Sequence, residues 1–125
     1  MKKEPLTFVV HVLESINRVE SFLKDSSKSE FLSDELLQSA VIRQIEIIGE
    51  AVKNLSFNFT KKYSNVPWKG IVGMRDKITH HYFGLDLDTI WDIIKEDIPV
   101  LKKEIKKILE MERSKFKNLN LLFIL

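Results

Sequence analysis

The apolar residues of this chain recur at steps of three and four, which is the period of an α-helix. The first such run follows Pro5, a residue that the first turn of a helix accepts, and further runs lie near residues 34–55, 67–84 and 86–108. No credible alternation of apolar and polar residues, the pattern of a half-buried strand, appears. We therefore expect an all-α fold, an up-and-down helical bundle of four main helices plus short extra helices.

Local signals predict where the first helices begin and end. Ser27 and Glu30 have the spacing of a capping box for a short helix, and the long second helix is expected to begin near Ser33 or Asp34. The segment 56–67 is expected to be irregular or to form one short helical turn. These signals predict short connections between the main helices.

The last two main helices also carry boundary signals. The third is expected to begin at Pro67 and to end at Gly84 as its C-cap, and Asp86 or Asp88 is expected to cap the fourth. Pro99 lies inside this last helix. Because proline lacks the N–H donor and crowds the carbonyl four residues back, we expect a kink there.

The size and composition fit one modest globular domain over residues 1–125, with an apolar tail at 118–125. The chain is 44% hydrophobic and 30% charged, and its net charge of +2 gives no bulk argument for nucleic-acid binding. It has no cysteine, which excludes a disulfide framework, a zinc ribbon and thiol catalysis and fits a cytoplasmic location.

Neither apolar terminus predicts contact with a membrane. The N-terminal run after the lysines is interrupted by His11 and Glu14, and no small-residue cleavage site follows, so we interpret it as a helix. The tail at 118–125 is too short to cross a bilayer. It either packs on the body of the protein or covers a partner surface.

Several apolar residues lie off the main stripes of the expected helices. They are Ile42, Ile47, Ile93 and the residues of the tail from Phe123 to Leu125. A self-association surface explains them, and so does a wide core-facing stripe. Both interpretations stand at this stage.

A cluster of chemically active side chains lies in the stretch MRDKITHHYFGLD, residues 74–86. Arg75, Asp76, His80, His81 and Tyr82 fall within eight residues, in a chain that has three histidines. Asp76 precedes His80 by one helical turn, so its carboxylate can accept a hydrogen bond from the imidazole and fix its tautomer. This is the arrangement of an oriented acid–base pair.

Arg75 and His80 are five residues apart, about 140° around an ideal helix. One rigid helix cannot direct both side chains at the same small target. The helix is distorted, or the arginine wraps around it, or two copies of the helix meet across a two-fold axis. The third option is the simplest, and it also gives the off-stripe apolar residues a function.

An arginine and a histidine together suit phosphodiester cleavage. Histidine transfers protons near neutral pH, and a guanidinium can hold two phosphate oxygens as negative charge develops on them. In RNA the neighbouring 2′-hydroxyl can act as the nucleophile, so the chemistry does not strictly require a metal or a cofactor. A metal site at His80 and His81 is not expected, because adjacent helical residues point about 100° apart.

Two motifs of the chain resemble the HEPN superfamily, and specifically its HepT-type toxins. The first is arginine, four residues, histidine, one residue and tyrosine, which here are Arg75, His80 and Tyr82, preceded by VPWKGIVGMRDK. The second is RQIEIIGEAVKNL, the hallmark of the second helix of that family. The likeness runs from about residue 32 to residue 87, and two motifs in the right order make it specific.

The resemblance implies an all-α bundle that forms a homodimer and places two copies of the motif in one cleft. It implies a metal-independent endoribonuclease of a type VII-like toxin–antitoxin pair, with RNA as substrate. The partner would be a minimal nucleotidyltransferase antitoxin that transfers AMP to Tyr82. Arg75 would stabilise the scissile phosphate, His80 would be the general base or acid, and Asp76 would support them.

Other polar residues have simpler interpretations. We expect His81 to face solvent and His11 to be structural. Glu46 and Glu50 are like charges one turn apart, for which either Arg43 or a nearby lysine compensates, or one of them steers Arg75 from across the bundle.

Glycines and lysines complete the set of sequence features. Gly49, in mid-helix, is expected to mark the close approach of another helix. Gly70 and Gly73 are interpreted in the same way, and Gly73 alternatively gives a substrate room near Arg75. A face of the last helix is basic and suits either solvent, an RNA backbone or an acidic partner; it consists of Lys102, Lys106, Arg113 and Lys117.

Two other functions remain open from the sequence. The chain is alternatively a non-catalytic helical module that binds a nucleotidyltransferase, or a plain structural dimer. RNA cleavage and its loss on substitution of Arg75 or His80 distinguish these alternatives from the nuclease.

Overall fold

Four long helices and four short helical segments make up the computed structural model, which describes residues 4–80 and 86–124, and the backbone alone at His80 and residues 116–124. The long helices are α1 (Pro5–Phe22), α3 (Glu35–Lys53), α5 (Trp68–His80) and α7 (Ile98–Ile124). The short ones are α2 (Lys28–Ser33), α4 (Phe57–Lys62), α6 (Leu87–Asp92) and the π-helical segment η2 (Ile93–Asp97). No strand occurs in these residues, which confirms the all-α prediction.

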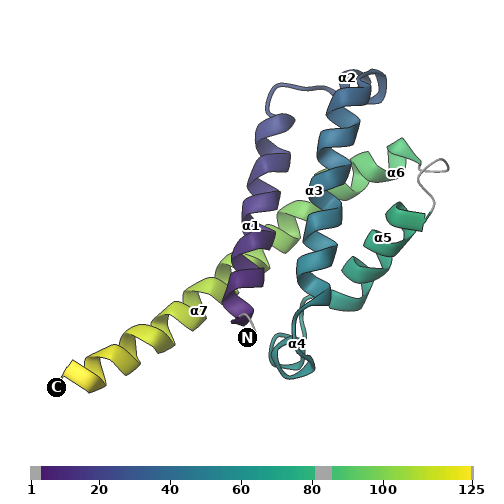
Figure 1. Cartoon of the computed structure of the whole chain (residues 1–125). Helices are drawn as coiled ribbons and strands as arrows, with labels where there is room; N and C mark the ends of the chain where they lie inside the picture. The colour runs from purple at the N-terminus through teal and green to yellow at the C-terminus, as the bar shows by residue number, and fades with distance from the viewer. Residues whose placement is uncertain (1–3, 81–85, 125) are drawn as a thin grey trace.

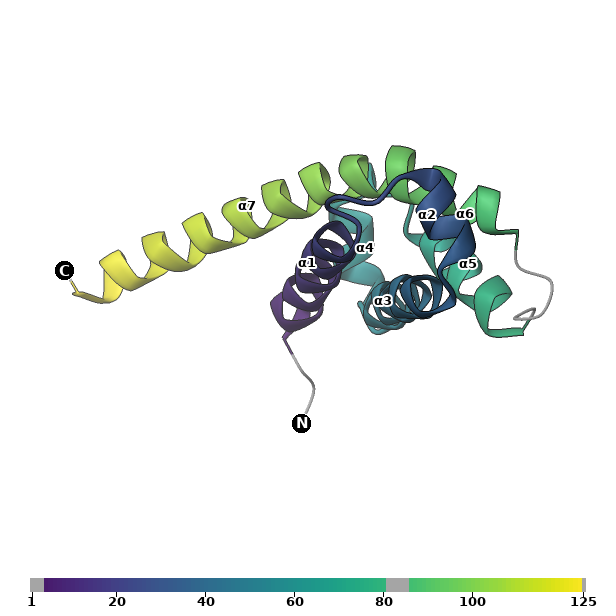
Figure 2. The same cartoon turned by 90° about the horizontal axis from the view of Figure 1, so that it is seen from above.

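The helices form two layers (Figures 1 and 2). In the first layer α3 lies between α1 and α5, and it has its most extensive contacts with these two helices. In the second layer α6, η2 and α7 follow one another as a single rod that crosses behind α1 and α3. The central helix α3 therefore presents one side to each of its neighbours and a third side to the rod.

Two apolar clusters hold these layers together and fix both ends of α5. The larger cluster contains Ile71 of α5, together with buried residues of α1, α3 and α7. The smaller one contains Ile78 of α5 with Phe31, Ile45 and Ile90. Ile71 is 8% exposed and Ile78 is 2% exposed, so burial anchors α5 one turn before and one turn after Arg75.

The predicted helix boundaries agree with the caps. The side chains of Ser27, Asp34 and Asp86 each accept a backbone N–H from the first turn of the following helix, at 3.1, 3.1 and 3.0 Å. Ser56 does the same for α4, which confirms a short helical turn in the segment before Pro67. The predicted C-cap at Gly84 lies outside the described residues.

The interruption expected at Pro99 takes the form of a π-turn. Immediately before the proline, residues 93–97 form η2, in which the N–H of Ile98 bonds the carbonyl of Ile93, five residues back. Because a proline crowds the carbonyl four residues before it, the wider turn makes room for the ring and keeps the rod continuous. The proline therefore alters the winding of the helix without ending it.

The off-stripe apolar residues have separate explanations. Ile42 is 5% exposed and belongs to the smaller cluster, and Ile93 packs in part against the larger one. For these two residues the wide core-facing stripe is correct. Ile47 is half-buried and faces the cleft described below.

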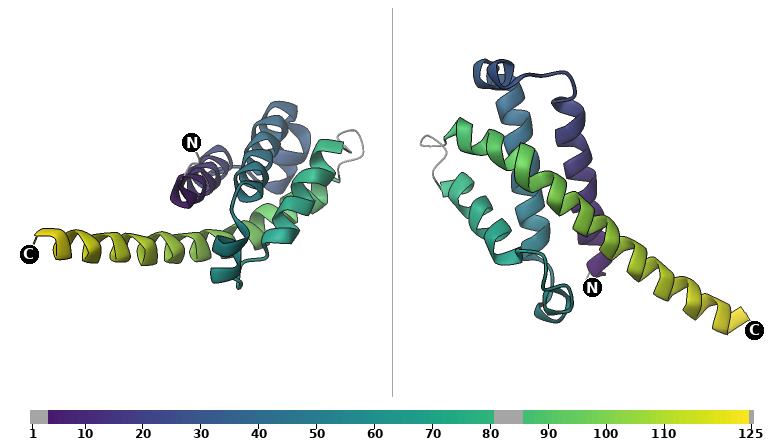
Figure 3. Two further views of the ribbon diagram at one scale, coloured as in Figure 1. Left: turned by 60° about the horizontal axis from the view of Figure 1, so that its bottom comes forward. Right: turned by 180° about the vertical axis from the view of Figure 1, so that it is seen from behind.

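The backbone of the predicted tail continues α7 as far as Ile124. Its last turns project beyond the bundle in every view (Figure 3). The ribbon thus runs away from the body of the protein instead of folding back onto it. In the part of the chain that the structure describes, no helix has the length and hydropathy needed to span a bilayer.

Candidate active site

Arg75 lies in the middle of α5, on the side of this helix that faces α3. Its guanidinium Nη2 is 2.7 Å from Oε2 of Glu50 on α3, and its Nη1 donates to Oδ1 of Asp76 at 3.1 Å. The Arg75 side chain is 23% exposed, so it is held between the helices while its end still reaches solvent. Two carboxylates from two helices therefore fix the direction of the guanidinium.

Gly49 permits this approach of the arginine. A Cβ atom placed on Gly49 would lie 2.1 Å from Cβ and 2.5 Å from Cγ of Arg75, far inside any real contact distance. The predicted close approach at Gly49 is confirmed, and the approaching group is the arginine of the motif. At Gly73 a Cβ would meet no atom within 4 Å, and at Gly70 it would meet only Cβ of Pro67 at 3.9 Å, an ordinary contact, so close approach is the wrong explanation at both. The alternative for Gly73, room for a substrate, stays a prediction.

The ion-pair partner of Glu50 decides between the two explanations of why two like charges, Glu46 and Glu50, lie one turn apart. Glu50 pairs with Arg75 across the bundle, so the account in which one of these glutamates steers the arginine is correct. Among the described residues, Arg43 has no carboxylate within 4.0 Å, so the simpler compensation by Arg43 is wrong. Glu46 is half-buried and likewise has no ion-pair partner in that part of the chain.

An open cleft of about 520 Å³ lies beside Arg75, between α1 and α3. A stripe of α3 forms one wall, and His11 and Phe8, one turn apart on α1, form the other. His11 is exposed and faces this cleft, so the structural role expected for it is wrong. The sequence offered one signal for this position, because His11 stands at a polar position of an amphipathic helix.

The remaining motif residues follow Arg75 along the chain. Thr79 donates its hydroxyl to the carbonyl of Arg75 at 2.9 Å, and the helix continues to His80, so the separation of about 140° between Arg75 and His80 is retained. The Asp76 carboxylate accepts a hydrogen bond from Arg75. Its predicted hydrogen bond with the imidazole of His80 stays a prediction, because only the backbone of His80 is described. Tyr82 and His81 also lie outside the described residues.

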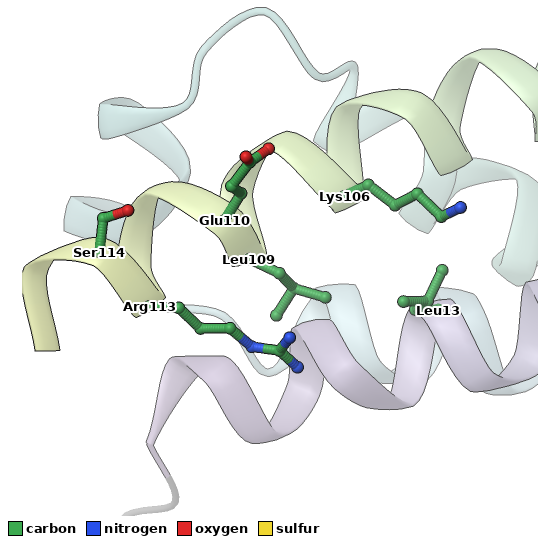
Figure 4. A pocket seen from close by; sticks show the side chains of 6 residues that line it. All are labelled: Leu13, Lys106, Leu109, Glu110, Arg113 and Ser114. Atoms are coloured by element: carbon green, nitrogen blue, oxygen red, sulfur yellow. The ribbon is translucent and has the colours of Figure 1, made fainter. Parts of the chain in front are cut away.

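The basic face of α7 borders a second open region, a groove of about 470 Å³ between α7 and α1 (Figure 4). Lys106 and Arg113 extend toward α1, beside Leu109 and Leu13, and Glu110 and Ser114 also line the groove. Lys102 forms an ion pair with Glu20 of α1. The predicted basic face therefore both binds α1 and leaves two cations at the edge of a groove.

The described residues contain no group of three or more histidine, aspartate or glutamate side chains placed to hold a metal ion. The groups that they do bring together are a guanidinium, two carboxylates and an open polar cleft. Arginine has more N–H donors than its two carboxylate contacts use, so donors remain for an incoming anion. This arrangement can bind a phosphate group in a fixed orientation.

Comparison with known proteins places the chain in a family. The profile of the family "Ribonuclease HepT-like" matches residues 12–108. The chain is 46% identical over 109 residues to a "putative RNase" of Methanocaldococcus jannaschii, covering 87% of this chain and 90% of that protein. It is 40% identical over 108 residues to a "probable ribonuclease HepT" of Thermococcus cleftensis, covering 86% of this chain and 98% of that protein.

Another relative from Methanocaldococcus jannaschii is longer. It is named "Gamma-glutamylcyclotransferase and putative RNase", and it is 48% identical over 118 residues, or 94% of this chain. The chain spans 53% of that relative. No solved structure matches the chain.

The family profile runs from within α1 to within α7, and Gly49, Glu50, Arg75 and His80 lie in the matched range. The matches support a ribonuclease activity for the chain. The chain therefore belongs to the HepT-like ribonuclease family.

Proposed function

We propose that the protein is a metal-independent endoribonuclease that acts as the toxin of a type VII-like toxin–antitoxin pair. Arg75 and His80 are its catalytic residues, and Asp76 supports them. The observation that carries the proposal is the guanidinium of Arg75, which Glu50 and Asp76 hold at the edge of an open cleft.

The held guanidinium suits the transition state of RNA cleavage. A group that is already oriented stabilises developing charge on phosphate oxygens without the cost of reorganising during the reaction. Glu50 is 56% exposed and Asp76 is 47% exposed, so water screens both ion pairs and a phosphate can compete for the guanidinium. The carboxylates thus orient Arg75 without occupying all of its donors.

The proposed reaction transfers the phosphate within the RNA strand. His80 removes the proton from a 2′-hydroxyl, the oxygen attacks the adjacent phosphorus, and the bond to the 5′-oxygen breaks. The leaving 5′-oxygen takes up the proton that His80 received, which returns the imidazole to its neutral form, so the products are a 2′,3′-cyclic phosphate and a 5′-hydroxyl. Arg75 balances the additional negative charge on the pentacoordinate phosphorus.

A homodimer completes this site. Arg75 and His80 are separated by about 140° on a helix that is regular as far as His80, so one copy of α5 cannot direct both at one phosphate. Two copies of α5 facing each other across a two-fold axis bring the arginine of one subunit near the histidine of the other. Sedimentation is expected to give twice the mass of the chain.

Regulation in this proposal occurs at Tyr82. A minimal nucleotidyltransferase antitoxin transfers AMP to the tyrosine hydroxyl, which is two residues beyond the catalytic histidine. The added AMP group carries negative charge, so it would repel the RNA backbone close to the catalytic histidine. Incubation with this partner and ATP should raise the mass of the chain by one or more AMP units at Tyr82 and stop cleavage.

The first test of the proposal is cleavage of total RNA in the presence of a chelator. Wild-type protein should cleave, and Arg75→Lys should be slower by about a hundredfold or more, because an ammonium lacks the planar fork that holds two oxygens. His80→Ala should be inactive. Product ends are identified by mass spectrometry as 2′,3′-cyclic phosphates.

Lys77→Ala is the matched control for these variants. Lys77 is an exposed cation on the same helix, it does not line the cleft beside Arg75, and its loss should leave cleavage unchanged. Full activity in Arg75→Lys or His80→Ala would remove that residue from the mechanism. A folded dimer that binds the nucleotidyltransferase but never cleaves RNA would instead identify a non-catalytic binding module.

A further inference from the structure

The cleft between α1 and α3 has features that catalysis at Arg75 does not require. We propose that it is a subsite for one nucleotide of the RNA strand and that it selects bases with an exocyclic amino group through Glu46. This inference deepens the proposed nuclease function and rests on it for the identity of the strand. It does not depend on the reaction itself.

The walls of the cleft have the dimensions of a nucleotide site. The α3 wall runs from Arg43 to Asn54, a length of about 16 Å along the helix axis. Phe8 and His11 face it from α1, and Arg75 enters at the edge from α5. A phosphate held by Arg75 therefore lies beside a cleft of about 520 Å³ that a neighbouring base can enter.

The base of the nucleotide has an apolar surface to contact. Phe8 is half-buried and offers an aromatic ring, and Ile47 and Ala51 contribute apolar surface from α3. Bases of single-stranded RNA stack on aromatic side chains, and this contact is independent of base identity. Phe8 thus supplies affinity but little selectivity.

Glu46 supplies the selectivity. A carboxylate in a cleft that receives RNA repels phosphates, and Glu50, one turn away, is neutralised by Arg75. Glu46 is half-buried and has no cation within 4.0 Å among the described residues. A carboxylate accepts hydrogen bonds from the amino groups of bases, so an amino-bearing base satisfies Glu46, whereas uracil offers no amino group.

An exposed cation at the same cleft, Arg43, offsets the charge of Glu46. Arg43 precedes Glu46 by one turn of α3, and its guanidinium has no carboxylate partner within 4.0 Å in the described part of the chain. It can bind a phosphate next to the one at Arg75. His11, on the opposite wall, offers a further polar contact to the same nucleotide.

The experiment measures binding without cleavage. Short 2′-O-methyl oligocytidine and oligouridine strands lack the attacking hydroxyl, and their dissociation constants with the full-length protein are measured by fluorescence anisotropy. Oligocytidine should bind at least about fivefold more tightly than oligouridine. In Glu46→Ala this preference should disappear, with oligouridine bound as well as before or better. Glu35→Ala, at the start of the same helix and outside the cleft, is the control.

Two further variants test the aromatic wall and the phosphate contact. Phe8→Leu should weaken both strands by about fivefold or more, whereas Phe57→Leu, at a phenylalanine that is 76% exposed on α4, should not. Arg43→Gln should lower the slope of log Kd against log salt by about 0.7, the value for one phosphate contact of a single strand. Arg18→Gln is its control.

The outcomes separate the subsite from the nuclease. Equal binding of the two strands by wild-type protein, or an unchanged preference in Glu46→Ala, overturns the subsite even if Arg75→Lys still slows cleavage as expected. Variants that alter dimer dissociation but not RNA affinity overturn it as well, because the cleft would then be a protein interface. A base preference that depends on Glu46, in a protein that cleaves no RNA, would support the subsite and refute the nuclease.

Discussion

At the scale of single residues, Gly49 has the least room for a side chain of the three described glycines, because Arg75 packs against it. The Cβ and Cγ atoms of Arg75 occupy the space that a side chain at position 49 would need. These atoms are close to the backbone of α5, so they cannot move without moving the helix. Glycine in mid-helix normally costs about 1 kcal/mol relative to alanine, and here it makes room for the arginine of the motif.

Gly49→Ala should therefore damage both stability and activity. We expect a loss of about 1–3 kcal/mol in the free energy of unfolding, measured with urea, and a loss of RNA cleavage. Gly73→Ala on α5 should instead stabilise the protein by about 0.5–1 kcal/mol, because its Cβ would enter open space in a helix. Equal effects of the two substitutions would contradict this account of Gly49.

At the scale of elements, a polar clamp ties the short helix α4 to α7. The Tyr63 hydroxyl donates to Oε1 of Glu112 at 2.5 Å, and Lys62 Nζ lies 2.9 Å from the same oxygen. The bond from Tyr63 holds the pKa of Glu112 below its usual value, with Lys62 acting in the same direction, while burial and this bond raise the pKa of Tyr63. The clamp joins segments about fifty residues apart.

Stability should follow the ionisation of Glu112. Its pKa is lower in the folded than in the unfolded chain, so its contribution is present above the unfolded value and is lost as pH falls through the folded value. At pH 7 Glu112→Gln should lower the free energy of unfolding by about 1–2 kcal/mol, and the difference from wild type should shrink below about pH 4. Glu110→Gln, at an exposed position of the same helix, should show no such difference.

At the scale of the whole molecule, α7 is longer than the bundle that it crosses. The last buried residue described on α7 is Leu109, and the clamp at Glu112 is the last described ion pair of this helix with another element. The helix nevertheless continues to Ile124 and projects from the body (Figures 1 and 3). Because the described core of the subunit ends before this projecting part of α7, removing the projecting part tests its role without removing core residues.

Deletion of residues 116–125 should leave the fold of the subunit intact. We expect an unchanged near-ultraviolet circular dichroism spectrum, because the described core lies before the deletion. A loss of the tertiary signal would show that the tail packs on the body after all. Sedimentation of the same variant tests the other expectation, that the tail covers a partner surface. A shift from dimer to monomer would assign the tail to the contact between subunits.

The sequence by itself determined the helices, their caps and the position of the motif. These features depend on residues three or four positions apart, such as Asp34 with Leu37, so the local pattern contains the information that predicts them. The interruption near Pro99 was predictable for the same reason, although the π-turn that accommodates it was not. Family membership also followed from local motifs.

Only the tertiary structure decided which side chains from different helices meet. Glu50 could have paired along its own helix, and its contact with Arg75 depends on how α3 and α5 are rotated and how closely they approach at Gly49. His11 and Phe8 came to face Arg75 because α1 packs on the other side of α3. Such contacts depend on the packing of whole helices, and no spacing within one segment contains that information.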